Sequence, residues 1–160
     1  MPEVYIAAGS NVAPIENLRR ALSLVRAHYS DLRCSTAYRN KAVGFEGDDF
    51  INLVAGFATS DSIETVLEHL HAAEAACGRE RQAPKWASRS MDLDVLLYGD
   101  TVCQRPGLVL PRPDLLKRAY MLGPLAEIAP NFVHPTAGKT IAELWRSFDR
   151  DAHPMTPVPL

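Results

Sequence analysis

The sequence lacks a set of paired cysteines, a long apolar run and an excess of charge of one sign. Its three cysteines, Cys34, Cys77 and Cys103, are odd in number and show no close metal-binding spacing, so we expect free thiols in a reducing compartment. No apolar run approaches membrane-spanning length, and no basic segment followed by an apolar stretch opens the chain. These absences predict a cytoplasmic protein.

The overall composition indicates an ordinary globular domain. The formal net charge of −2 offers no whole-molecule attraction for nucleic acid or an anionic membrane, so any anion-binding region must be local. Apolar residues make up 47% of the chain, and 160 residues are enough to bury a core without disulfides. We therefore predict a single domain over residues 1–160, in which the proline-rich residues 151–160 form a tail.

Hydrophobic periodicity predicts alternating strands and helices. Asp61, with Glu64 three residues later, resembles a capping box at the start of the second helix. The order of the first six elements is typical of an α+β fold with a ferredoxin-like βαββαβ core, an antiparallel sheet with both helices on one face. The predicted strands lie near residues 4–8, 34–38, 50–58 and 91–98, and the predicted helices near 14–28, 61–78, 120–128 and 140–148.

Two acidic residues, Asp92 and Asp94, stand two positions apart in the predicted strand 91–98. On a strand such side chains share one face and lie about 6–7 Å apart along the chain. Two carboxylates in this arrangement can hold two Mg²⁺ ions that bridge the oxygens of a nucleoside triphosphate. The alternative interpretation is a pair of acids on the solvent-facing edge of a sheet.

The polar segment 79–89, which precedes these two acids, is locally basic. It carries four basic side chains against one acid, a local charge of +3 in a chain of net −2. Guanidinium groups bind phosphate oxygens through paired hydrogen bonds, so a basic loop beside two acids favours a site for a metal–triphosphate complex. Trp86 in this loop either lies over an adenine ring or covers the edge of the core. The four basic residues are Arg79, Arg81, Lys85 and Arg89.

Residues 85–96 combine both features, and their pattern K-x-A-S-R-x-x-D-L-D-V-L resembles the signature of the 6-hydroxymethyl-7,8-dihydropterin pyrophosphokinases. The resemblance covers nearly all of the chain except the tail, and its motifs occur in the same order as in the family. The further matching segments are Y-I-A-A-G-S-N at 5–11, Tyr38-Arg39, Phe50-Ile51-Asn52 and M-L-x-P-L-x-E-I-A-P at 121–130.

This resemblance implies transfer of pyrophosphate from ATP to the hydroxymethyl group of the pterin, with release of AMP, in tetrahydrofolate biosynthesis. Asp92 and Asp94 match the two ligands of a pair of Mg²⁺ ions, and Arg79 and Arg89 match arginines that bind the triphosphate. Further positions match the nucleotide site: Glu74, Arg81, Trp86, Arg112 and Arg118. The positions that match the pterin site are Asn40, Val43, Phe50, Asn52 and Tyr120, with Phe50 and Tyr120 placed to sandwich the bicycle.

The resemblance further implies a monomer whose partners are ATP and the pterin, not nucleic acid or a membrane. The chain departs from the family pattern in its catalytic loops. Arg112-Pro113 stands where the family has histidine, Lys41 where it has proline, and Gln82 where a further cation is common. Two alternatives therefore stay open: a divergent relative that binds pterin or nucleotide without efficient transfer, and a ferredoxin-like regulatory or interaction module.

Overall fold

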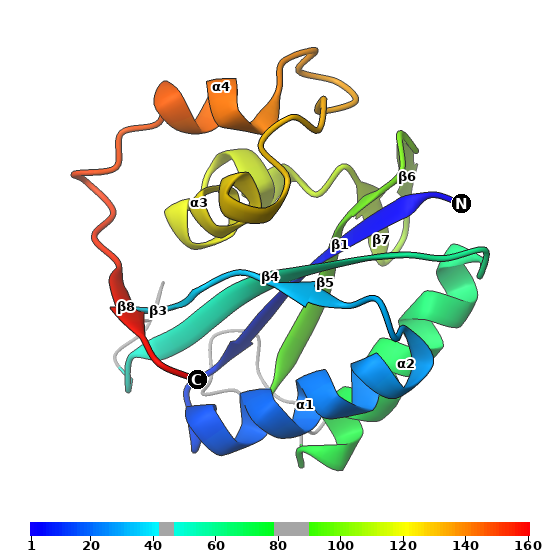
Figure 1. The fold of residues 1–160 in the computed structure, drawn as a ribbon, viewed down its shortest axis with the longest axis vertical. Helices are drawn as coiled ribbons and strands as arrows, with labels where there is room; N and C mark the ends of the chain where they lie inside the picture. The colour runs from blue at the N-terminus through cyan, green and yellow to red at the C-terminus, as the bar shows by residue number, and fades with distance from the viewer. Residues whose placement is uncertain (42–46, 79–89) are drawn as a thin grey trace.

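The computed structural model describes residues 1–41, 47–78 and 90–160. It is a mixed structure in which helices pack on an antiparallel sheet (Figure 1). The strands are β1 (Glu3–Ser10), β2 (Arg33–Cys34), β3 (Ala37–Asn40), β4 (Phe50–Ala58), β5 (Asp92–Tyr98), β6 (Cys103–Arg105), β7 (Leu108–Leu110) and β8 (Thr156–Val158). The helices are α1 (Pro14–His28), α2 (Ile63–Ala76), the short 3-10 helix η1 (Pro113–Leu116), α3 (Ala119–Ile128) and α4 (Ile141–Arg146).

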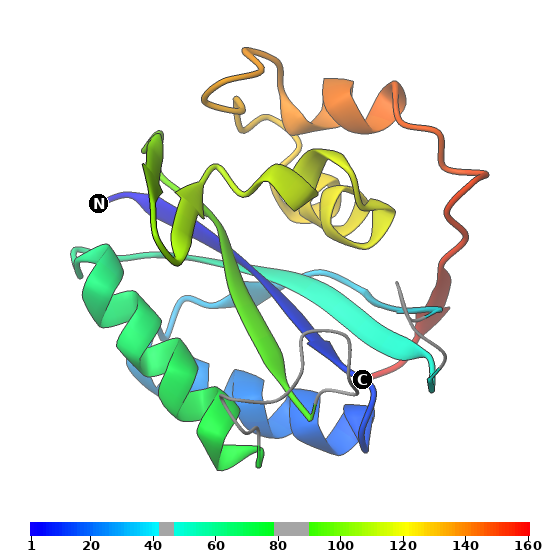
Figure 2. The ribbon, with the colours of Figure 1, turned by 180° about the vertical axis from the view of Figure 1, so that it is seen from behind.

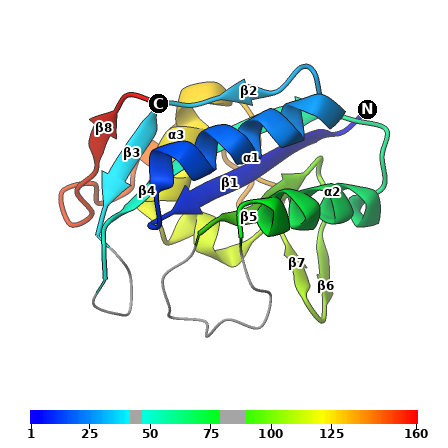
Figure 3. The same cartoon turned by 90° about the horizontal axis from the view of Figure 1, so that it is seen from below.

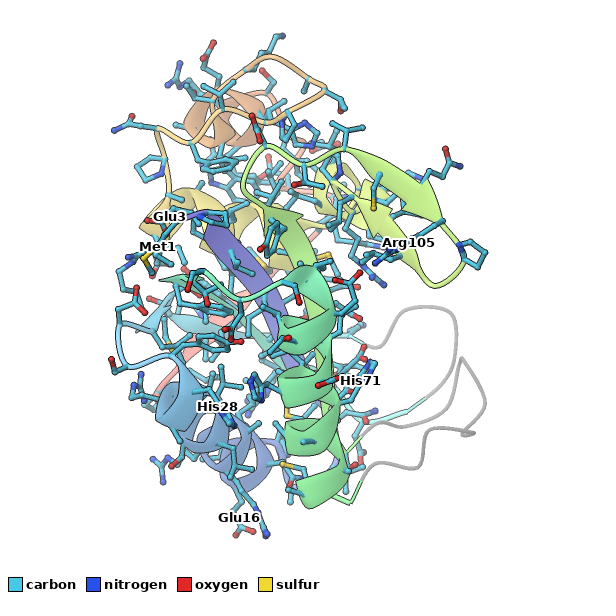
Figure 4. All side chains as sticks on the ribbon, turned by 90° about the vertical axis from the view of Figure 1, so that its right-hand side faces the viewer. Met1, Glu3, Glu16, His28, His71 and Arg105 are labelled. Carbon is cyan, nitrogen blue, oxygen red and sulfur yellow. The ribbon has the colours of Figure 1, made fainter. Side chains whose placement is uncertain are left out.

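The main sheet has the strand order β5-β1-β4-β3-β8, and β2 pairs with β4 beside β3. The pairings described within it are antiparallel. The register places Gly9 of β1 opposite Asn52 of β4 on one side and opposite Asp92 of β5 on the other. Strands β6 and β7 form a separate hairpin that carries Arg105 (Figure 4). An ion pair of 2.7 Å between Arg105 and Glu64 ties this hairpin to α2.

The helices cover both faces of the sheet. Helices α1 and α2 lie side by side on one face, as Figure 3 shows, and α3 and α4 lie on the opposite face (Figures 1 and 2). Val4, Ile6 and Ala8 of β1 accordingly belong to the core beneath α1 and α2, whereas Tyr5 and Ala7 belong to the core beneath α3. The prediction of two helices on one face holds for α1 and α2, and the structure adds a third layer on the other face.

Local sequence signals account for the bounds of α1. Pro14 occupies the first turn of the helix, where its missing N–H leaves no hydrogen bond unmade. The residues buried against the sheet recur at helical spacing, and the predicted range 14–28 is confirmed. These residues are Leu18, Ala21, Leu22 and Val25.

Helix α2 begins differently from the prediction. Ser62, not Asp61, is the N-cap residue, and its side chain accepts a hydrogen bond of 3.2 Å from the Thr65 N–H. Asp61 instead accepts a hydrogen bond of 2.9 Å from the hydroxyl of Tyr29. The predicted capping box of Asp61 and Glu64 is therefore wrong.

The predicted strand 34–38 is interrupted in the structure. Ser35 lies between β2 and β3, where its N–H donates to the Val54 carbonyl and its hydroxyl accepts from the Val54 N–H, at 2.8 and 3.0 Å. The buried serine hydroxyl thus takes the place of a backbone carbonyl at this break.

The C-terminal residues differ from the predicted tail. Within 151–160, residues Thr156–Val158 form β8, which pairs with β3 through Ala37 opposite Val158 and Arg39 opposite Thr156 (Figure 1). Two prolines stand next to or within this strand, which is tolerated because β8 is at the edge of the sheet. Among the described residues, no helix has both the length and the apolar character needed to cross a membrane.

Candidate active site

The candidate site lies on the face of the sheet that α3 covers. Side chains alternate between the two faces of a strand, and the neighbouring residues Leu53, Leu93 and Val95 belong to the core on the opposite face. The register then aligns Asp92 of β5, Gly9 of β1 and Asn52 of β4 in one row across the sheet. Because adjacent strands are about 4.8 Å apart, the backbones at Asp92 and Asn52 are about 10 Å apart.

Asp92 and Asp94 project from this face at alternate positions of β5, and both are partly buried. Between them, the backbone N–H of Leu93 donates a hydrogen bond of 2.8 Å to the carboxylate of Glu74. Glu74 belongs to the last part of α2 and is only 7% exposed. Because β5 is an edge strand, this bond anchors the strand between the two acids through a side chain rather than another strand.

Arg112 reaches this pair of acids from the segment that precedes η1. Its Nη1 lies 3.6 Å from Oδ1 of Asp94, and its Nε lies 3.9 Å from Oδ2 of Asp114. Its backbone N–H donates to the Leu96 carbonyl at 2.9 Å, which fixes the residue against β5. Within the described residues the buried Nε makes no hydrogen bond, so the guanidinium keeps a donor beside the acids.

Tyr120, at the start of α3, lies within electrostatic range of the same acids. Burial raises the pKa of Tyr120 above its ordinary value, Arg118 acts to lower it, and Asp114, Asp92 and Asp94 act to raise it further. The structure therefore brings together a residue predicted to bind the pterin, one predicted to bind the nucleotide and the two predicted metal ligands.

Asn52 is the polar residue at the β4 end of the row. It is 8% exposed, and its Nδ2 donates a hydrogen bond of 2.6 Å to Oδ1 of Asn40. A Cβ atom at Gly9 would clash with Oδ1 of Asn52, so only glycine leaves room for this amide where it lies. From the sequence, Gly9 is expected only as a turn residue. In the structure, the side chain of Asn52 on the neighbouring strand is the stronger reason why glycine is needed at this position.

A cavity of about 260 Å³ adjoins this row between β3 and α3. Asn40, Lys41, Arg118 and Tyr120 line it together with residues 152–155 of the C-terminal segment. The sequence does not identify residues 152–155 as site residues, because their composition carries no signal that they fold back against Arg118 and Tyr120, more than thirty positions earlier. Phe50, the remaining described residue of the predicted pterin set, is partly buried at the start of β4, opposite Asn40.

Five of the predicted site residues lie outside the described residues. They are Val43, Arg79, Arg81, Trp86 and Arg89. His71, which Figure 4 shows on α2, belongs to the helix that also carries Glu74.

The donor set fits Mg²⁺. Within residues 1–41, 47–78 and 90–160, no cluster of three or more His, Cys, Asp or Glu side chains is arranged to hold a metal ion. Mg²⁺ characteristically takes one or two protein carboxylates and completes its shell with water and substrate phosphates. Asp92 and Asp94 provide two carboxylates of this kind.

The acid pair beside Arg112, on a sheet covered by helices on both faces, suits an enzyme that binds a metal–nucleotide complex. The family model of 7,8-dihydro-6-hydroxymethylpterin-pyrophosphokinase (HPPK) matches residues 5–130. The chain belongs to this family, which confirms the resemblance seen in the sequence.

Relatives named 2-amino-4-hydroxy-6-hydroxymethyldihydropteridine pyrophosphokinase align with most of the chain. The protein of Synechocystis is 39% identical over 148 residues, which are 90% of this chain and 75% of the relative. The protein of Aquifex aeolicus is 36% identical over 145 residues, 89% of this chain and 90% of the relative. The protein of Haemophilus influenzae is 35% identical over 152 residues, 92% and 94% of the two chains.

Solved structures share the fold. A crystal structure of HPPK-DHPS in complex with substrates superposes with a TM-score of 0.72 at 12% identity. The match covers 91% of this chain and 44% of the solved chain. The HPPK-DHPS of Plasmodium falciparum with STZ-DHP gives a TM-score of 0.68 at 13% identity, over 91% and 41% of the two chains. This chain thus spans less than half the length of these solved chains, and the likeness concerns the fold.

Proposed function

We propose that this protein transfers pyrophosphate from ATP to the hydroxymethyl group of 6-hydroxymethyl-7,8-dihydropterin and releases AMP. The protein is accordingly a transferase of folate biosynthesis. The observation that carries this proposal is the shared face of the sheet, where Asp92 lies about two strand spacings from the buried amide of Asn52 in the same row and Asp94 follows two residues further along β5. Membership of the pyrophosphokinase family supports it.

Asp92 and Asp94 would hold two Mg²⁺ ions. When bound, these ions would neutralise charge on the triphosphate and orient its β-phosphate. The separation of the two acids by one residue on β5 and the anchoring of Leu93 by Glu74 support this assignment, because both fix the direction in which the carboxylates point. Glu74 would thus position the metal ligands, and by the family pattern we also assign it to the nucleotide site.

The pterin would lie between the row and α3. The amide of Asn52, oriented by Asn40, suits the hydrogen-bonding edge of the bicycle, and Phe50 and Tyr120 suit its two faces. We also assign Val43 to this pocket, by the family pattern. The distance across two strands leaves room for a bicycle held at Asn52 to direct its hydroxymethyl group towards β5.

The triphosphate would lie beside β5 and the segment that precedes η1. Arg112 supports this placement, because its guanidinium lies beside Asp94 and its side chain is partly exposed. Arg118 is partly buried near Tyr120 and suits the same ligand. By the family pattern we add Arg79, Arg81, Trp86 and Arg89 to this part of the site.

The reaction needs no covalent intermediate on the protein. The pterin hydroxyl attacks the β-phosphorus in line, AMP leaves with the bridging oxygen, and the proton of the hydroxyl passes to solvent or phosphate. The protein contributes position, charge neutralisation and exclusion of water. We assign no side chain as general base.

We further propose that the core is ferredoxin-like and that the chain is a single domain, a monomer and cytoplasmic. The strand order β5-β1-β4-β3, with α1 and α2 on one face, supports the first of these proposals. The C-terminal β8 and the layer of α3 and α4 would then be additions to that core.

The test is the formation of AMP from ATP and Mg²⁺, with and without 6-hydroxymethyl-7,8-dihydropterin. We expect AMP to appear only when the pterin is present. Pterin binding without AMP would refute the transfer activity and identify a relative that only binds. ADP in place of AMP would mean attack at the γ-phosphorus and would refute the proposed reaction.

A further inference from the structure

The cavity beside Tyr120 joins three parts of the chain that are remote in sequence. Its walls come from residues 40–41 at the end of β3, from residues 118–120 at the start of α3 and from residues 152–155 before β8. Two of its residues, Asn40 and Tyr120, belong to the proposed pterin site. The C-terminal segment therefore borders the pocket in which the ring substrate would lie.

This segment is fixed at both ends. After it, β8 pairs with β3 next to Asn40. Before it, the guanidinium of Arg150 lies 5.1 Å from the centre of the Trp145 ring, and the ring centres of Phe148 and His153 are 5.3 Å apart. The His153 N–H also donates to the Arg150 carbonyl at 3.1 Å. Residues 152–155 are thus part of the folded structure.

Met155 connects the segment to α3. A Cβ atom placed on Gly123 would lie 3.2 Å from Cε of Met155, so the methionine packs against the bare backbone of the helix at this point. Tyr120 precedes Gly123 by three residues, and residues three apart occupy the same face of a helix. Met155 therefore lies on the face of α3 that carries Tyr120, and both border the cavity.

We propose that residues 152–155 position the aromatic wall of the pterin site, with Met155 as the residue that holds Tyr120 against the bicycle. This inference rests on the proposed function. Removing the methionine side chain would enlarge a cavity that already borders Tyr120 and would let the ring turn away from its stacking position. The segment would thus contribute to pterin affinity without touching the nucleotide.

The test compares Met155→Ala with Met155→Leu, which restores most of the side-chain volume. Val158→Ala is the matched control, because it shortens an apolar side chain in the adjoining strand β8, outside the cavity. The measurements are KM for the pterin, KM for ATP and kcat from AMP formation. The affinity for the pterin is also measured directly by calorimetry, with Mg²⁺ and a non-hydrolysable ATP analogue present.

We expect Met155→Ala to raise KM and Kd for the pterin by about fivefold or more, with KM for ATP changed by less than about twofold. Met155→Leu should restore pterin affinity, and Val158→Ala should leave it within about twofold of the wild type. Unchanged pterin affinity in Met155→Ala, or an equal loss in Val158→Ala, would overturn the inference alone. A wild-type protein that binds no pterin and forms no AMP would overturn the proposed function and this inference with it.

Discussion

The carboxylate of Glu74 is a buried group on which the geometry of the proposed metal site depends. It accepts the hydrogen bond from the Leu93 N–H, and this backbone group stands between Asp92 and Asp94. A buried N–H that loses its acceptor costs about 1–3 kcal/mol. The local position of β5 would change at the same time, because β5 is the edge strand of the sheet that the described residues form.

We predict that Glu74→Ala lowers the free energy of unfolding by about 2 kcal/mol and raises the Mg²⁺ concentration needed for half-maximal AMP formation. Glu74→Gln keeps an oxygen acceptor for Leu93 and should recover much of the stability. The control is Glu68→Ala, on the exposed side of the same helix. Urea unfolding and Mg²⁺ titrations are the measurements. A Glu74→Ala variant with unchanged stability and Mg²⁺ dependence would contradict the positioning role.

Asp94, which we propose as a metal ligand, also forms an ion pair with Arg112. We predict that Asp94→Ala leaves the protein folded, because the carboxylate is only partly buried, but reduces pterin-dependent AMP formation by about 10³-fold. Asp100→Asn, in the exposed turn after β5, should retain activity. Thermal unfolding would report on the fold. An Asp94→Ala variant that kept more than a small fraction of the activity would refute the assignment of two metal ions.

Gly9 is required because Asn52 fills the space where a Cβ atom would lie. We predict that Gly9→Ala lowers the free energy of unfolding by about 1–3 kcal/mol and raises KM for the pterin, since the methyl group displaces the amide. In the double variant Gly9→Ala, Asn52→Ala the clash is absent, so stability should recover while KM for the pterin stays high. If the single variant behaved as the wild type in both measurements, Asn52 would not occupy the position described.

At the scale of the elements, Glu127 ties α3 to the break between β2 and β3. Its carboxylate accepts hydrogen bonds from the Thr36 N–H at 2.6 Å, the Thr36 hydroxyl at 2.8 Å and the Tyr38 hydroxyl at 2.7 Å. Burial acts to raise the pKa of Glu127, but these hydrogen bonds outweigh it, so the pKa lies below its ordinary value. This contact sets α3, and with it Tyr120, relative to the strand that carries Asn40.

The stabilisation from Glu127 should depend on pH. Because the folded-state pKa is lowered, the contribution is complete above the unfolded-state pKa of about 4.3 and is lost as the pH falls through the folded-state value. We predict that Glu127→Gln costs about 1 kcal/mol at pH 7, a value reduced by the exposure of the group. The difference from the wild type should vanish in acid. Glu68→Gln is the control, and a cost that did not depend on pH would contradict the charged hydrogen bonds.

Element positions were predictable where the signal is local. The pattern from Pro14 to Val25 fixes one face of α1, and the apolar run that begins at Phe50 gives the bounds of β4. The predicted N-cap of α2 is one residue too early, because Asp61 and Ser62 are both residues that favour this position. Only the tertiary hydrogen bond between Tyr29 and Asp61 shows that Ser62 is the cap. Strand β8 could not be predicted, because it depends on pairing with a strand more than a hundred residues earlier.

At the scale of the whole molecule, the site depends on register and layering. That Asp92 and Asp94 share a face follows from the period of a strand, and the sequence alone gives it. Asn52 lies on the same face, with Gly9 between it and Asp92, only because the strands are arranged in the order β5-β1-β4. The placement of Tyr120 and Met155 further requires the layer of α3 and the return of the C-terminal segment, which no local pattern contains.

The most direct test of the account follows the γ-phosphate. ATP labelled at the γ-phosphorus is incubated with the protein, Mg²⁺ and 6-hydroxymethyl-7,8-dihydropterin, and the products are separated. The account predicts that the label appears in the pterin product and that one unlabelled AMP forms for each labelled pterin. Label found in inorganic phosphate, or in the pterin with ADP as the second product, would contradict pyrophosphoryl transfer.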